Sequence, residues 1–137
     1  MRIKKWVEAI RKIVHYSNFN DLYEIKETLG KGKFGLVKLG IHKETGRKVA
    51  VKIINKQLVD DIDVQQVKSE IDILKIAKHP NIIKLYDIFE NEHFIFIIME
   101  YCQGGDLFSY IEKRGFKLKE DFAAKIIHKL CTAVSFL

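Results

Sequence analysis

The 137-residue chain has few residues that break or crosslink a fold. It has one proline, Pro80, and two cysteines, Cys102 and Cys131, whose spacing fits neither a metal site nor a redox pair. Its longest strongly apolar run, Phe94 to Met99, is far too short to cross a bilayer. No low-complexity linker, internal repeat or signal-peptide pattern occurs. These absences argue against a disulfide scaffold and a repeat array, and we expect a cytoplasmic protein with reduced thiols.

The net charge of +6 is unevenly distributed along the chain. Residues 1–16 contain five lysines and arginines and one acidic residue, Glu8, and so carry +4 of that total. The body of the chain therefore has no broad basic surface, and nucleic acid is not an expected partner. Its 47% apolar and 31% charged residues are typical of a folded domain with one core.

Changes in the hydrophobic period predict the order of strands and helices. Strands are expected from 23 to the glycines near 30, and at 36–43, 48–55, 83–89 and 94–99; helices at about 61–78, from 106 and from 119. Asp60 or Asp61 is a favourable N-cap for the first of these helices, and Pro80 ends it. The strands lack the repeated helical crossovers of a doubly wound fold, so we expect an α+β fold with an antiparallel sheet.

A glycine-rich segment, LGKGKFGLV, lies between the first two predicted strands. Gly30, Gly32 and Gly35 form the pattern Gly-x-Gly-x-x-Gly, in which missing side chains let backbone N–H groups approach phosphate oxygens. The dinucleotide-binding version lies between a strand and a helix. Here both flanks are strand-like and Val37 stands two residues after the last glycine, which is the kinase variant. A plain hairpin turn is the alternative.

Two charged residues fall where apolar residues are expected. Lys52 lies within the apolar strand VAVKII, and Glu70 lies in the apolar stripe of Val67 and Ile71 on the following helix. A buried charge is costly unless an opposite charge meets it. We therefore expect Lys52 and Glu70 to pair and to leave the ammonium group positioned for a phosphate; extension of the lysine to the edge of the sheet is the alternative.

Four motifs occur in order: LGKGKFGLV, VAVK, SEIDILKIAKHPNI and IIMEYCQGGDLF. Together, over residues 23–137, they resemble the small lobe and hinge of a protein kinase, followed by the first two helices of its large lobe. The residues within these motifs are most similar to those of the calcium/calmodulin-dependent group of serine/threonine kinases, which includes calcium-dependent and protein kinase D-like enzymes. The resemblance implies a five-stranded antiparallel sheet with one main helix, and an enzyme of calcium signalling that transfers the γ-phosphate of ATP to protein hydroxyls.

The resemblance also implies roles for residues on the phosphate side of the site. Gly30, Gly32 and Gly35 would shape a lid over the phosphates, with Phe34 at its tip. Lys31 and Lys33 lie between these glycines in the same loop. Lys52 would hold the α- and β-phosphates and would be oriented by Glu70, the two residues to which a catalytic role is carried over.

On the adenine side, the resemblance implies that Leu29, Val37 and Ala50 enclose the base. Met99 would control access to the pocket behind the adenine, and the backbones of Glu100 and Cys102 would bind its edge. Asp106 would accept hydrogen bonds from the ribose hydroxyls. Each residue also has an ordinary interpretation: Val37 and Met99 suit any core, and Asp106 suits a helix N-cap.

The catalytic-loop motif His-Arg-Asp and the motif Asp-Phe-Gly do not occur in the 137 residues. Asp121-Phe122-Ala123 is a near-match, but it opens a predicted helix and no catalytic loop precedes it. We therefore expect a kinase domain truncated before its catalytic loop, which lacks the Mg²⁺ ligands and the remainder of the large lobe. On its own it should not transfer phosphate, and a non-catalytic, pseudokinase-like module that binds nucleotide or protein is the alternative function.

Residues 2–15, RIKKWVEAIRKIVH, form a predicted basic amphipathic helix. Such a helix suits an anionic membrane surface or a calmodulin-like partner. It also resembles the last helix of a pleckstrin-homology domain, in which a tryptophan occupies the place of Trp6. A brace on the small lobe is the third interpretation. We favour the end of a pleckstrin-homology domain for residues 1–18, because such a domain precedes the kinase in protein kinase D-like enzymes; the full-length protein could then associate with membranes.

Overall fold

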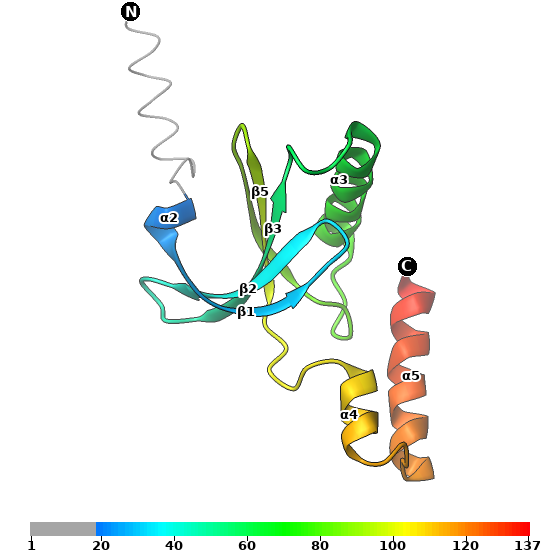
Figure 1. Ribbon diagram of the computed structural model, residues 1–137. Helices are drawn as coiled ribbons and strands as arrows, with labels where there is room; N and C mark the ends of the chain where they lie inside the picture. The colour runs from blue at the N-terminus through cyan, green and yellow to red at the C-terminus, as the bar shows by residue number, and fades with distance from the viewer. Residues whose placement is uncertain (1–18) are drawn as a thin grey trace, which may run out of the picture.

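A computed structural model describes residues 19–137, so the helix predicted at 2–15 and the domain assignment of residues 1–18 lie outside the described part. Figure 1 shows a twisted sheet with α3 beside it, and α4 and α5 beyond the end of β5. In chain order the elements are α2 (Phe19–Leu22), β1 (Tyr23–Lys31), β2 (Gly35–His42), β3 (Lys48–Asn55), α3 (Asp61–Ile76), β4 (Leu85–Glu90), β5 (Phe94–Glu100), α4 (Leu107–Lys113) and α5 (Glu120–Phe136). None of these helices is both long and apolar enough to span a membrane.

The five strands form one sheet in the order β1-β2-β3-β5-β4, and every neighbouring pair is antiparallel. The predicted α+β fold is therefore confirmed. The N-cap of α3 is Asp60, whose side chain accepts a hydrogen bond from the Asp63 N–H at 2.8 Å. The strand expected from residue 83 begins only at Leu85, because the preceding residues form a turn in which the Ile82 N–H donates to the His79 carbonyl.

The core has two parts, one on each face of β3 and β5. On one face, Ile54 of β3 packs with Ile95 and Ile97 of β5 and with Val67 and Ile71 of α3. On the other face a second buried cluster contains Phe19, Tyr23, Val49, Val51 and Ile98. The prediction that the third strand is covered on both faces is confirmed, and this coverage explains why its sequence is apolar nearly throughout.

The second cluster depends on a residue that the sequence pattern does not reveal. Phe19 stands between Asn18 and Asn20 in the sequence, outside every predicted strand and helix, yet its side chain is only 2% exposed. Its ring stacks on Phe96 at 4.5 Å between centroids and on Tyr23 at 5.6 Å. The four-residue helix α2 has a single buried side chain, so it offers no periodicity from which its position could be predicted.

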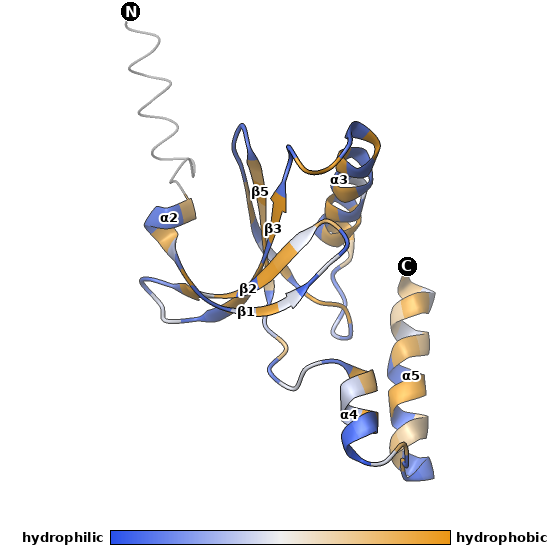
Figure 2. Cartoon of the chain, in the orientation of Figure 1, coloured by the Kyte–Doolittle hydropathy of each residue, from blue (hydrophilic) through white to orange (hydrophobic). Residues whose placement is uncertain are grey.

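Helix α5 has an apolar surface that the described residues leave uncovered. Ile127, Leu130 and Val134 are 59%, 54% and 68% exposed, and Figure 2 shows apolar residues along most of the helix. The contacts of α5 with the small lobe include the His79 and Phe136 rings, whose centroids lie 5.2 Å apart.

Candidate functional site

The glycine-rich segment is the turn of the β1–β2 hairpin. Gly30 lies opposite Val37 across the hairpin, and the Gly32 N–H donates to the Gly35 carbonyl at 2.7 Å, which closes the turn. The chain thus enters and leaves the loop as a strand. This is the context of the kinase variant and not of the dinucleotide-binding variant.

The three glycines differ in what the fold itself requires of them. A Cβ atom on Gly35 would lie 1.9 Å from the Ile53 carbonyl oxygen, so close packing on β3 demands a glycine there. Around Gly30 no atom lies within 4 Å of the Cβ position, and at Gly32 the nearest atom is at 3.6 Å. Neither of these two residues has a positive φ. Packing and backbone conformation therefore do not explain why glycine stands at positions 30 and 32. A loop whose backbone N–H groups approach phosphate oxygens closely does explain it, because a side chain would hinder that approach.

Lys52 lies directly beneath this loop. Its Cε atom is 3.8 Å from the position that a Cβ on Gly32 would occupy, and its side chain is 17% exposed. The Lys52 Nζ lies 3.7 Å from the Glu70 Oε1, so the predicted pairing of the two residues is confirmed. This distance suits an ion pair but is too long for a strong hydrogen bond, so the ammonium group keeps donors for an anion beneath the loop.

The premise that Glu70 would be desolvated is wrong. Its side chain is 52% exposed, because Val67 and Ile71 face the sheet while Glu70 lies at the margin of that face. An ion pair with one exposed partner contributes only about 0.2–1 kcal/mol to stability. The pair is therefore better explained by positioning of the Lys52 ammonium group than by stabilisation of the fold.

The other residues of the loop are held against α3 or face solvent. Lys33 Nζ lies 3.6 Å from the Asp63 Oδ1 in the first turn of α3 and 4.7 Å from the centroid of the Phe34 ring. Phe34 is half-buried and packs against the core cluster that contains Ile54. Lys31 is exposed. The contact of the loop with α3 escapes sequence analysis, because nothing in the pattern links two charges thirty residues apart.

Register places three of the residues expected on the adenine side, Val37, Ala50 and Met99, on the same face as Lys52. Val37 lies opposite Lys52, and Ala50 lies opposite Met99. Directly paired residues share a face, as do residues two apart on one strand, so all four side chains are on the α3 face of the sheet. Val37, Ala50 and Met99 are half-buried, and Leu29 on β1 is 39% exposed. The Val37, Ala50 and Met99 side chains and the Lys52 ammonium group therefore lie in one strip on this face.

The chain then leaves β5 through the segment that the kinase resemblance assigns to the hinge. The Glu100 N–H donates to the Lys84 carbonyl at 2.9 Å, and the Glu100 carboxylate accepts from the Lys84 N–H at 3.2 Å. Exposed Cys102 closes a turn by accepting from the Gly105 N–H. Glu100 thereby fixes the end of β5 against the start of β4.

Asp106 is the N-cap of α4. Its Oδ1 accepts from the Ser109 N–H at 2.7 Å, and its Oδ2 lies 3.1 Å from the Ser109 hydroxyl. The hydrogen bond from the Ser109 backbone is the main reason that the pKa of Asp106 lies below its ordinary value. The carboxylate is thus ionised and exposed near the hinge, and its observed contacts are those of a helix cap.

The kinase resemblance implies two ligands, ATP and Mg²⁺, and the residues present suit them unequally. The residues present match the chemistry of a triphosphate, since a partly buried lysine, Lys52, lies beneath a glycine loop that has no side chains at Gly30 and Gly32. For Mg²⁺ no ligand set is present: within residues 19–137 no three His, Cys, Asp or Glu side chains lie close enough to hold a metal ion. We therefore assign no step to a metal.

Residues 23–137 match the family described as the protein kinase domain. The match begins at the first residue of β1 and includes the glycine loop, the Lys52–Glu70 pair and the segment after β5. It covers most of the chain, and the five-stranded antiparallel sheet with α3 is consistent with the small lobe of that fold. The chain therefore belongs to the protein kinase family of ATP-dependent transferases.

Proposed function

We propose that the chain binds ATP between the glycine loop and β3, as part of a serine/threonine kinase of the calcium/calmodulin-dependent type. The observation that carries the proposal is the position of Lys52, beneath Gly32 and 3.7 Å from Glu70. Of the two lysines on β3, Lys48 is exposed at the start of the strand, whereas the Lys52 side chain is only 17% exposed and lies directly opposite Val37.

In this proposal, backbone N–H groups of the glycine loop other than that of Gly32 bind the phosphates, and Lys52 holds the α- and β-phosphates while Glu70 orients its ammonium group. On the adenine side, Leu29, Val37 and Ala50 enclose the base, and Met99 limits the space behind it. The backbones of Glu100 and Cys102 bind the adenine edge, and Asp106 accepts from the ribose.

Binding of an ATP analogue to a Lys52→Ala variant tests the proposal. A hydrogen bond from a charged donor contributes about 1.5–3 kcal/mol, so the dissociation constant should rise roughly 10- to 100-fold. Lys48→Ala is the matched control, because Lys48 is exposed at the start of the same strand. An affinity that falls equally in the two variants would contradict the proposed role of Lys52.

The serine/threonine preference is supported by the similarity of the four kinase motifs to those of the calcium/calmodulin-dependent group. Phosphoamino acid analysis of peptides phosphorylated by the native protein should then detect phosphoserine or phosphothreonine, and phosphotyrosine would refute the preference. The 137-residue chain on its own contains no catalytic-loop motif, so we expect it to bind ATP without turnover. Sustained phosphate transfer by this chain, abolished by Lys52→Ala, would show that expectation to be wrong.

We also propose that the apolar face of α5 is covered by further protein, as the remainder of a kinase large lobe would cover it. The exposure of Ile127, Leu130 and Val134 supports this proposal, because contiguous exposed apolar surface marks an interaction site. The isolated chain should bind a hydrophobic dye, and Leu130→Lys with Val134→Lys should remove most of that binding. Unchanged dye binding in the double variant would show that the dye binds another surface, and would contradict the proposal that the apolar face of α5 is an interaction site.

A further inference from the structure

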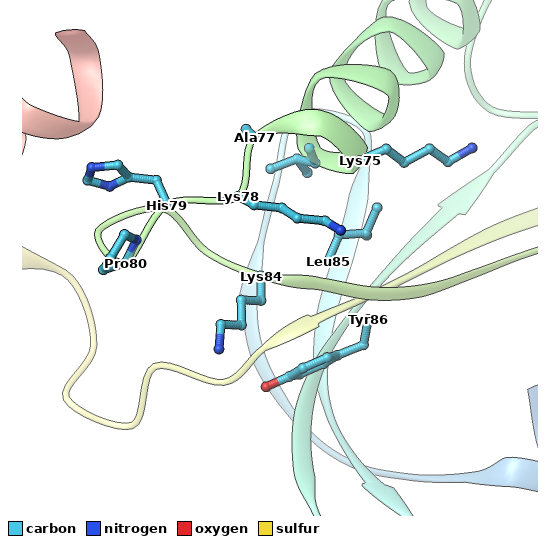
Figure 3. A pocket seen from close by; sticks show the side chains of 9 residues that line it. Lys75, Ala77, Lys78, His79, Pro80, Lys84, Leu85 and Tyr86 are labelled. Carbon is cyan, nitrogen blue, oxygen red and sulfur yellow. The ribbon is translucent and has the colours of Figure 1, made fainter. Parts of the chain in front are cut away.

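A cavity of about 470 Å³ lies between the end of α3 and the start of β4, and it is distinct from the site beneath the glycine loop. Leu74, Ala77 and Leu85 supply its apolar side, and none of the residues that bind the proposed nucleotide lines it. Figure 3 shows Lys78 extending toward Leu85, while Lys84 projects from the chain entering β4. We refer to this feature as the α3–β4 cavity.

The rim of the α3–β4 cavity is positively charged. Lys75, Lys78 and Lys84 line it, no acidic residue does, and all three lysines are exposed. In the part of the chain that the structure describes, none of the three forms an ion pair, whereas Lys52, Lys33, Lys56 and Lys68 all do. The nearby Glu100 carboxylate accepts a hydrogen bond from the backbone of Lys84. An occupant of the cavity therefore meets three exposed lysine ammonium groups, which form no ion pairs among the described residues, around an apolar floor.

The cavity also lies beside an edge strand. β4 is the last strand of the sheet, so its outer side has no strand neighbour within residues 19–137. An extended peptide can run along such an edge and place an apolar side chain in an adjacent hollow. A free phosphate would use only the lysines and would leave the apolar floor formed by Leu74, Ala77 and Leu85 uncovered.

We propose that the α3–β4 cavity binds an acidic peptide segment of a partner protein. An apolar side chain of the peptide packs on Leu74 and Leu85, and flanking carboxylates pair with Lys75, Lys78 and Lys84. This interaction is separate from ATP binding, because the Lys52 site contributes no residue to it.

The test measures binding of a fluorescein-labelled peptide, in which leucines alternate with pairs of glutamates, to the 137-residue chain by fluorescence anisotropy. Lys75→Glu with Lys78→Glu should weaken binding by about tenfold or more, since charge reversal replaces attraction by repulsion. Lys113→Glu with Lys117→Glu is the matched control, because these lysines are exposed and lie outside the cavity, and it should change affinity less than about twofold. Replacing each leucine of the peptide by serine should also weaken binding by about tenfold or more.

The neutral double variant Lys75→Gln with Lys78→Gln is a second, milder change, and circular dichroism checks that it folds. Its affinity for the peptide should lie between that of wild type and that of the charge-reversed variant. Equal binding of the leucine and serine peptides would overturn the proposal, because the apolar floor would then be unused. If the Lys113→Glu with Lys117→Glu control lost as much affinity for the peptide, net charge alone would explain the effect and the proposal would also be overturned. Binding to phosphatidylserine vesicles without binding to the peptide would assign the cavity to a lipid surface and would also overturn it.

Discussion

Replacement of Phe19 by alanine tests whether the segment before the family match belongs to the folded domain. The side chain is 2% exposed and packs on Phe96 and Tyr23, although it precedes the match to residues 23–137. Truncation of a fully buried phenylalanine costs about 3–5 kcal/mol, which is a large share of the roughly 5–15 kcal/mol that stabilises a domain.

Urea unfolding followed by circular dichroism measures this loss. With a denaturant slope of about 2 kcal/mol per molar, a loss of about 4 kcal/mol lowers the unfolding midpoint by about 2 M. Phe108→Ala is the matched control, because Phe108 is 67% exposed, and it should move the midpoint little. If Phe19→Ala and Phe108→Ala had the same small effect, the packing of α2 on the sheet would be refuted.

Two further predictions concern the loop and the acid stability of the fold. Gly35→Ala should lower both stability and ATP affinity because its Cβ would collide with the Ile53 carbonyl, whereas Gly30→Ala should lower affinity alone; equal stability losses by urea unfolding would contradict this. The hydrogen bond from Lys56 is the main reason that the pKa of Glu90 lies below its ordinary value of about 4.3. The ionised Glu90 carboxylate therefore stabilises the fold above that ordinary pKa, and this stabilisation is lost as the pH falls through the lower pKa of the folded state. Glu90→Gln should flatten that part of the pH profile of unfolding, and an unchanged profile would show that the Glu90 ion pairs are unimportant.

Local patterns were sufficient to predict most of the fold. The bounds of β3 follow from an apolar run that both faces of the sheet bury, and the start of α3 follows from the capping chemistry of Asp60. The pairing of Lys52 with Glu70 was predicted because each charge interrupts an apolar pattern, even though Glu70 is more exposed than that argument assumed.

Contacts between distant segments could not be predicted in this way. Phe19 is one apolar residue among polar neighbours, and its burial depends on the position of Phe96 across the sheet. The ion pair of Lys33 with Asp63 joins two residues that look like ordinary surface charges in the sequence. The α3–β4 cavity likewise depends on how α3 and β4 meet in three dimensions, which no local pattern encodes.

The central claim is that Lys52 contacts the phosphates of bound ATP. An acyl-phosphate derivative of ATP transfers its acyl group to the lysine amine nearest the phosphates, and mass spectrometry of the labelled chain identifies that lysine. We predict labelling at Lys52 that excess ATP prevents, with weaker labelling of other lysines in the glycine loop. ATP-sensitive labelling at Lys75, Lys78 or Lys84, with none at Lys52, would contradict the account, because the nucleotide would then occupy the α3–β4 cavity.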